Sequence, residues 1–324
     1  MDRDSIDWRG YIPAITTPFD ANGALDLNAE RQLCRWLLNE GIHGMIALGT
    51  QGEWFSLSRG ERRDMLRVVS EELKGHMTII AGCNAFTAEE VSANAALAAE
   101  FGFDGVLVTP PPYVCPTEGE IYEFYRRVNE LVTLPICVYN WPPGTHVNMS
   151  RALLERICEL DRVVAIKNST AGFDMNHYLD VFFSLNDRVR VFGMPTNDLG
   201  ISLTLQHGAD GTMGAGAVLG REYADYFEAI WDGDIDRARA LGQRLDLVMS
   251  RLFNPDYTAK YGSTQGTFKA LLNLQGLPGG HTRAPVMDLD EHGLEKVRET
   301  LAILDRLPAG SVQPARAVGA GVSA

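Results

Sequence analysis

The sequence lacks the features that mark several large classes of protein. Its five cysteines are scattered, and none forms a C-x-x-C pair, which argues against a zinc site or a disulfide framework. No apolar run approaches the ~20 residues of a membrane span. The polar N-terminal stretch MDRDSIDWRG holds no apolar signal segment. These absences predict a cytoplasmic protein with reduced thiols, no bound metal and no membrane partner.

Basic residues are also in short supply. Acidic residues outnumber basic ones by 42 to 29, which gives a formal charge of −13. A nucleic-acid binder needs clustered Lys and Arg to neutralise phosphates, so we expect no nucleic-acid partner. An anionic small molecule is still compatible, because a few local donors can override the overall charge.

The sequence does contain a regular alternation of short β-rich runs and helical patterns. Apolar residues make up 45 % of the 324 residues, which is enough for a sizeable core. Several β-rich runs are apolar throughout, as in parallel sheets buried on both faces. The predicted strands are Ile12 to Thr17, Met45 to Leu48, Thr78 to Ala81, Val106 to Val108, Ile136 to Tyr139, Val163 to Ile166, Val189 to Phe192 and, more weakly, Gly211 to Met213.

Helix signals lie between these runs. The range 27–39 carries leucines at near-helical spacing. Ser58 with Glu61, and Thr87 with Glu90, have the spacing of a capping box, which marks the start of a helix.

About eight strand–helix units predict parallel strands joined by right-handed crossovers. A doubly wound open sheet is the main alternative, but no G-x-G-x-x-G follows the first strand. We therefore predict an α/β protein with a (β/α)₈ TIM barrel over residues 1–232. Further helical patterns, at 234–252, 264–274 and 291–307, predict a C-terminal helical extension over 233–307. Residues 308–324 have the composition of a disordered tail.

Active residues of such barrels follow the C-terminal ends of the strands. Lys167 comes directly after the apolar run Val163 to Ile166, so its amine should be desolvated and more often neutral. A neutral amine condenses with a keto group, and the iminium formed acidifies the neighbouring carbon. On the strand alone, a lysine that snorkels into solvent or pairs with an acid is favoured over a reactive one.

Three further candidates follow other predicted strands. Tyr139 can relay protons through its phenol, although its ring could simply fill the barrel mouth. The Gly49 to Gly52 segment offers backbone N–H groups and the Thr50 hydroxyl to a carboxylate. Tyr113 follows a triple proline, and by itself it fits a subunit interface equally well.

Together these segments resemble the dihydrodipicolinate synthase / N-acetylneuraminate lyase family of class I aldolases and lyases. Leu48 to Glu53 is similar to the family's G-[TS]-T-G-E loop. Val138 to Pro142 is similar to its Y-N-x-P motif, and Ala165 to Thr170 to its I-K-[DE]-[AS]-[ST] motif. The resemblance runs from Ile12 to about Pro285.

The resemblance implies a role for each matched residue. Lys167 would form the Schiff base, and Tyr139 would be the acid/base phenol in a hydroxyl relay with Thr50. Tyr113 would join that relay from a neighbouring subunit, since family members are usually tetramers. The 2-oxo acid would be held by Gly49, Thr50, Gln51 and the backbone carbonyl of Met213. No cofactor is implied.

The departures from the family's motifs narrow the range of possible substrates. Gly144 stands where dihydrodipicolinate-forming enzymes have an arginine for the distal carboxylate. The residues after Gly193 do not supply the acidic pair that sialic-acid lyases use for sugar hydroxyls. Gln51 replaces the second threonine of the loop. The candidates for the distal pocket are Trp141, Gly144, His146 and Gly193.

The leading hypothesis is a pyruvate-dependent aldolase acting on a 2-oxo acid, such as a 2-keto-3-deoxy sugar acid or a 4-hydroxy-2-oxo acid. A Schiff-base dehydratase of a 2-keto-3-deoxy sugar acid is the alternative. A dihydrodipicolinate synthase and a non-catalytic 2-oxo acid sensor rank below both. The sequence does not separate aldolase from dehydratase, because both begin at the same lysine.

Overall fold

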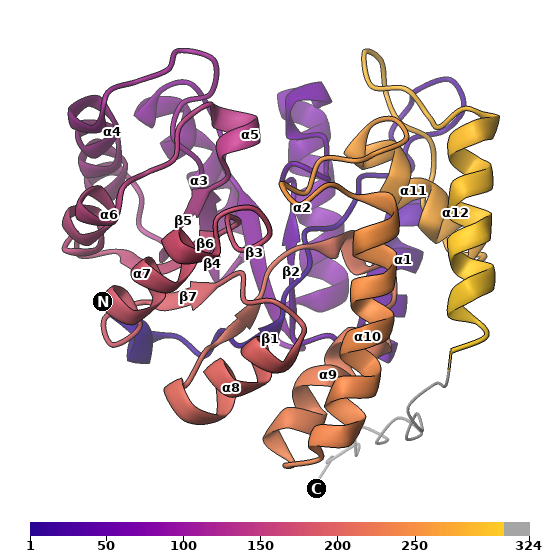
Figure 1. Ribbon diagram of the computed structural model, residues 1–324. Helices are drawn as coiled ribbons and strands as arrows, with labels where there is room; N and C mark the ends of the chain where they lie inside the picture. The colour runs from indigo at the N-terminus through magenta and orange to yellow at the C-terminus, as the bar shows by residue number, and fades with distance from the viewer. Residues whose placement is uncertain (308–324) are drawn as a thin grey trace, which may run out of the picture.

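A parallel β-barrel forms the centre of the molecule, with helices around it (Figure 1). The computed structural model describes residues 1–307, so the predicted tail over 308–324 lies outside the described residues. Neighbouring strands are parallel in the order β1-β8-β7-β6-β5-β4-β3-β2. The strands are β1 Gly10–Tyr11, β2 Gly44–Ala47, β3 Thr78–Gly82, β4 Gly105–Val108, β5 Ile136–Asn140, β6 Val163–Asn168, β7 Arg190–Phe192 and β8 Gly211–Thr212. The predicted (β/α)₈ barrel is confirmed.

The first strand differs from its prediction. β1 pairs with β8 over Gly10–Tyr11 only, whereas a strand was predicted over 12–17. Pro13 has no N–H for a continuous ladder, and that segment makes isolated contacts instead. Ala14 bridges Ile46 of β2, which joins the two ends of the sheet and closes the barrel.

The outer helices begin where their caps predict. Ser58 caps α2 in a complete capping box with Glu61. Thr87 caps α3 by accepting from the Glu90 N–H, but the Glu90 carboxylate accepts from Phe86 N–H instead of closing the box. The helices are α1 Leu27–Asn39, α2 Arg59–Leu73, α3 Ala88–Phe101, α4 Glu118–Leu131, α5 Pro142–Thr145, α6 Arg151–Cys158, α7 Met175–Leu185, α8 Asp198–His207 and α9 Arg221–Trp231.

Two apolar layers hold the barrel together. Inside it, side chains such as Ile46, Ile80, Leu107 and Phe192 form one closed cluster. A larger cluster fills the space between strands and helices. Because successive side chains of a strand point to opposite faces, both faces of these strands are buried, as their continuous apolar runs predicted.

The predicted C-terminal helices are present as α10 Ile235–Leu252, α11 Thr264–Leu274 and α12 Glu291–Leu304. α12 ends three residues before its predicted end. α10 packs against α9 and α12, and α11 lies beside α12 (Figure 1). No helix within residues 1–307 is both long and apolar enough to cross a membrane.

Candidate active site

A cavity of about 410 Å³ opens at the C-terminal ends of the barrel strands. Its walls include Lys167, Tyr139 and Gln51 from strand ends that the sequence had singled out, together with Gly193 and Met213. Active sites of (β/α)₈ enzymes occupy this face, because the loops that follow the strands gather there.

Lys167 is placed at the cavity by β6. Its side chain is 2 % exposed, and burial lowers the pKa of its amine to about 8. Within residues 1–307 the Nζ forms no ion pair, so no carboxylate stabilises the charged form. The side chain therefore does not snorkel into solvent, and a useful fraction of the amine is neutral near pH 7.

Tyr139 lies beside Lys167, because β5 and β6 pair them directly. The Lys167 Nζ is 4.2 Å from the centre of the Tyr139 ring. Burial raises the pKa of Tyr139, and hydrogen bonds with the Ser169 and Thr50 side chains oppose this increase. The phenol thus keeps its proton near neutral pH and sits within a group of hydroxyls that can relay it.

Ser169 is a site residue that we did not predict. It lines the cavity and hydrogen-bonds with Tyr139. A signal was available, because residues two apart on a strand share a face and Ser169 is two residues after Lys167.

The loop after β2 brings Gln51 to the cavity, whereas Gly49, Thr50 and Gly52 are outside its lining. No hydrogen bond from the amide N–H of Gln51 or Gly52 is found within residues 1–307. The Gln51 side-chain Oε1 is buried, also without a partner in that part of the chain, and Gln51 lines the cavity. Buried polar groups are normally paired, so this loop fits a polar ligand.

The four distal-pocket candidates separate into two pairs. Trp141 and Gly193 line the cavity, whereas Gly144 and His146 are exposed and lie outside its lining. The Trp141 ring is parallel to the Tyr139 ring, and its indole N–H donates to the Asp256 carbonyl at 2.9 Å. A Cβ on Gly144 would lie 2.5 Å from the Trp141 ring. The position next to the indole therefore has no room for a side chain.

Tyr113 is separate from the other candidates in this chain. It is 84 % exposed in the loop between β4 and α4, with a φ of 73°. It does not line the cavity of its own chain.

The C-terminal segment forms a wall of the cavity that sequence reasoning missed. This wall is rich in polar and charged groups, and it faces Thr196 and Asn197 from the loop after β7. Its polar lining residues are Asp246, Ser250, Asn254, Tyr257 and Lys260. They come from α10 and the loop after it, where no motif marks them, so only the fold reveals them.

The fold defines a (β/α)₈-barrel protein with a cavity at the C-terminal face of the barrel. Residues 7–304 match the model of the dihydrodipicolinate synthetase family, and the chain belongs to this family. Its members are lyases with a Schiff-base lysine. The matched range includes both the barrel and the C-terminal helices.

Known relatives match this protein over most of its length. An uncharacterized DapA-like lyase of Rhizobium meliloti is 30% identical, over 91% of this chain and 95% of its own. The dihydrodipicolinate synthase of Thermotoga maritima has 27% identity and a TM-score of 0.81, over 93% of this chain and 99% of its own. A catalytic-lysine mutant of the Ruminococcus gnavus sialic acid aldolase shares the fold at 21% identity, with a TM-score of 0.80 over 92% and 96% of the chains.

Proposed function

We propose that the protein is a pyruvate-dependent aldolase that cleaves a hydroxylated 2-oxo acid through an imine on Lys167. The observation that carries this proposal is the buried Lys167 amine, without an ion-pair partner within residues 1–307, beside the Tyr139 phenol at the cavity. A pKa of about 8 supplies the neutral amine that imine formation needs.

The reaction proceeds in balanced steps. The Lys167 Nζ attacks the C2 carbonyl, and loss of water from the carbinolamine gives the iminium. Tyr139 gives its proton to the hydroxyl that leaves the carbinolamine. The phenolate, in relay with Thr50, then takes the proton of the C4 hydroxyl as the C3–C4 bond breaks and an aldehyde leaves. The remaining enamine is protonated at C3, and water hydrolyses the iminium to release pyruvate and the free amine.

The substrate carboxylate would be received by the loop after β2, through the N–H groups of Gln51 and Gly52, which make no hydrogen bond within the described residues. Gly49 and the Thr50 hydroxyl would complete this contact, and the Met213 carbonyl would face the substrate near C2. Support comes from these two amides, unpaired in the part of the chain that the structure describes, and from Gln51 and Met213 in the cavity lining.

The polar wall favours a substrate with several hydroxyl groups, such as a 2-keto-3-deoxy sugar acid. Hydroxyl, amide and charged side chains on this wall match such a chain. The synthesis of dihydrodipicolinate fits less well, because the Trp141 ring fills the space beside Gly144 and leaves no room there for an arginine.

We also propose that the enzyme is a cytoplasmic homo-oligomer, a tetramer by family resemblance, in which Tyr113 reaches the site of a neighbouring subunit. Support comes from the exposure of this large aromatic side chain outside the cavity of its own chain. Tyr113→Phe should then lower turnover, and mixing it with Lys167→Ala should partly restore activity in hybrid oligomers.

The decisive experiment is borohydride reduction in the presence of pyruvate, followed by mass spectrometry. One reduced pyruvate per chain, attached to Lys167, is expected. Lys167→Ala should gain no mass, whereas Lys74→Ala, a control at the C-terminal end of α2 and outside the cavity lining, should label normally. No adduct on the wild type, or equal labelling of Lys167→Ala, would remove the imine mechanism.

Product analysis then separates the aldolase from the dehydratase. An aldolase releases pyruvate and an aldehyde, whereas a dehydratase gives a 2-oxo acid of unchanged carbon number that has lost water. Incubation with 2-keto-3-deoxy sugar acids, and assay of pyruvate with lactate dehydrogenase, distinguishes them.

A further inference from the structure

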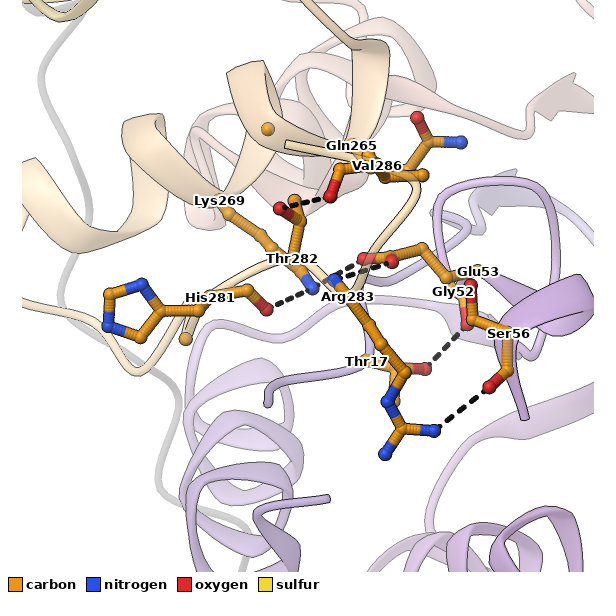
Figure 2. A network of polar contacts seen from close by, with 12 residues as sticks. Thr17, Gly52, Glu53, Ser56, Gln265, Lys269, His281, Thr282, Arg283 and Val286 are labelled. Carbon is orange, nitrogen blue, oxygen red and sulfur yellow. Dashed lines mark hydrogen bonds and ion pairs between the residues drawn. The ribbon is translucent and has the colours of Figure 1, made fainter. Parts of the chain in front are cut away.

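The loop after β2 is held from outside the barrel by the C-terminal segment. Figure 2 shows Glu53 of this loop facing the Lys269 side chain of α11 and the backbone of Arg283 in the segment after it, while Gly52 faces Thr17. The network joins residues more than 200 positions apart in the sequence, such as Lys269 and Glu53. The proposed carboxylate-binding loop therefore does not set its shape alone.

Gln265, near the start of α11, fixes one peptide of the loop. Its Nε2 donates to the Thr50 carbonyl at 3.0 Å, and this side chain is almost fully buried. In a planar trans peptide the C=O and the following N–H point in opposite directions. Because Gln265 draws the Thr50 carbonyl toward α11, the Gln51 N–H is turned away from α11.

Lys269 and Glu53 fix the end of the loop. Their charged groups are 2.6 Å apart, and both side chains are buried. The second Glu53 oxygen accepts from the Arg283 N–H at 3.1 Å, and Lys269 also donates to the His281 carbonyl. Glu53 has a φ of 49°, a left-handed conformation that a non-glycine residue keeps only when its surroundings hold it.

The Arg283 side chain also connects the C-terminal segment to the start of α2. Its guanidinium donates to the Ser56 carbonyl and pairs with Glu61. Hydrogen bonding to Arg283 lowers the pKa of Glu61 to about 2, so this pair is charged throughout the neutral range. On the barrel side, Thr17 donates to the Gly52 carbonyl at 2.8 Å.

We propose that Gln265 and Lys269 are positioning residues that hold the loop after β2 so that the Gln51 N–H faces the substrate carboxylate. This inference rests on the proposed function, because it assigns the loop to a 2-oxo acid. The C-terminal helices then belong to the catalytic apparatus, although Gln265 and Lys269 do not touch the substrate. By linkage, pyruvate binding also stabilises the start of α11.

The test compares Gln265→Leu with Gln275→Leu. Both glutamines lie at the ends of α11 and donate from Nε2 to backbone carbonyls, but Gln275 contacts Val218 and Leu271, away from the loop. We expect Gln265→Leu to raise the pyruvate concentration for half-maximal borohydride trapping by about fivefold, the effect of losing one hydrogen bond. Labelling at saturating pyruvate and the apparent pKa of the amine should stay at wild-type values, and Gln275→Leu should trap like the wild type.

A second variant and a second readout distinguish the loss of this hydrogen bond from misfolding of the variant. Gln265→Glu keeps the size of the side chain but loses the donor, so it should weaken trapping at least as much. In hydrogen exchange, pyruvate should slow the amides of Thr264 to Phe268 in the wild type and not in Gln265→Leu. Unchanged half-saturation in both Gln265 variants, or an equal change in Gln275→Leu, would overturn the inference while imine formation stands. A wild type that forms no imine would instead overturn the proposed function.

Discussion

The Lys167 amine lies over the face of the Tyr139 ring, 4.2 Å from its centre, on the strand paired with that of the tyrosine. A ring face attracts an ammonium ion, whereas burial disfavours it. Burial is the larger effect here, and it lowers the pKa of Lys167 to about 8. Roughly one amine in ten is then neutral at pH 7.

This pKa predicts the pH dependence of imine formation. The rate of borohydride trapping at low pyruvate should rise about tenfold per pH unit below 8 and level off above it, because only the neutral amine attacks. Stopped-flow measurement between pH 6 and 9.5 gives the profile. A flat profile, or an inflection near 10.5, would mean that Lys167 is not desolvated in solution.

Replacing Tyr139 by Phe should lower turnover by roughly 10²-fold or more, the usual effect of losing a positioned acid/base group. The ring is retained, so the environment of Lys167 and the thermal stability should change little. Steady-state kinetics with the cleaved substrate, together with a melting curve, test this. Near-normal turnover would remove the phenol from the mechanism.

Introducing the missing arginine should not create a dihydrodipicolinate synthase. In Gly144→Arg the new Cβ would lie 2.5 Å from the Trp141 ring, so the indole must leave its place beside Tyr139. We expect reduced aldolase kcat/KM and no synthase activity with pyruvate and aspartate semialdehyde. The double variant Gly144→Arg with Trp141→Ala relieves the clash and serves as the comparison. Synthase activity in the single variant would contradict this account.

Glu30 on α1 should weaken the fold as the pH rises. Burial raises the pKa of Glu30 to about 8, and its Oε2 has no hydrogen-bond partner within residues 1–307. Between an unfolded pKa of about 4.3 and the folded value, the unfolded chain releases a proton that the folded chain keeps. Stability contributed by this group therefore falls across that window.

Glu30→Gln removes this proton release while keeping the size of the side chain. The variant should gain urea resistance relative to the wild type at pH 8 and show little difference at pH 4.5. Unfolding midpoints at the two pH values give the comparison. An equal difference in unfolding midpoint at both pH values would mean that the substitution acts through packing and not through the proton.

The sequence predicted the barrel well, because the spacing of apolar residues and the helix N-caps are local signals. The observed bounds of α1 and α11 are the predicted ones, and Ser58 with Glu61 forms the predicted capping box. The first strand was wrong because Pro13 interrupts its ladder. Lys167 and Tyr139 were found because strand ends converge in this fold, whereas Lys260 and Asn254 were missed because only tertiary packing brings α10 and its loop over the barrel mouth.

The polar wall of the cavity is encoded largely by one continuous stretch, from Asp246 to Lys260. The groups proposed to form and break bonds lie earlier in the chain, at the ends of β2, β5 and β6. The proposed recognition of the substrate tail is thus encoded apart from the proposed chemistry at its keto group. Exchanging this short stretch offers a route to new substrates, with the Asp256 carbonyl kept in place because it accepts from the Trp141 indole beside Tyr139.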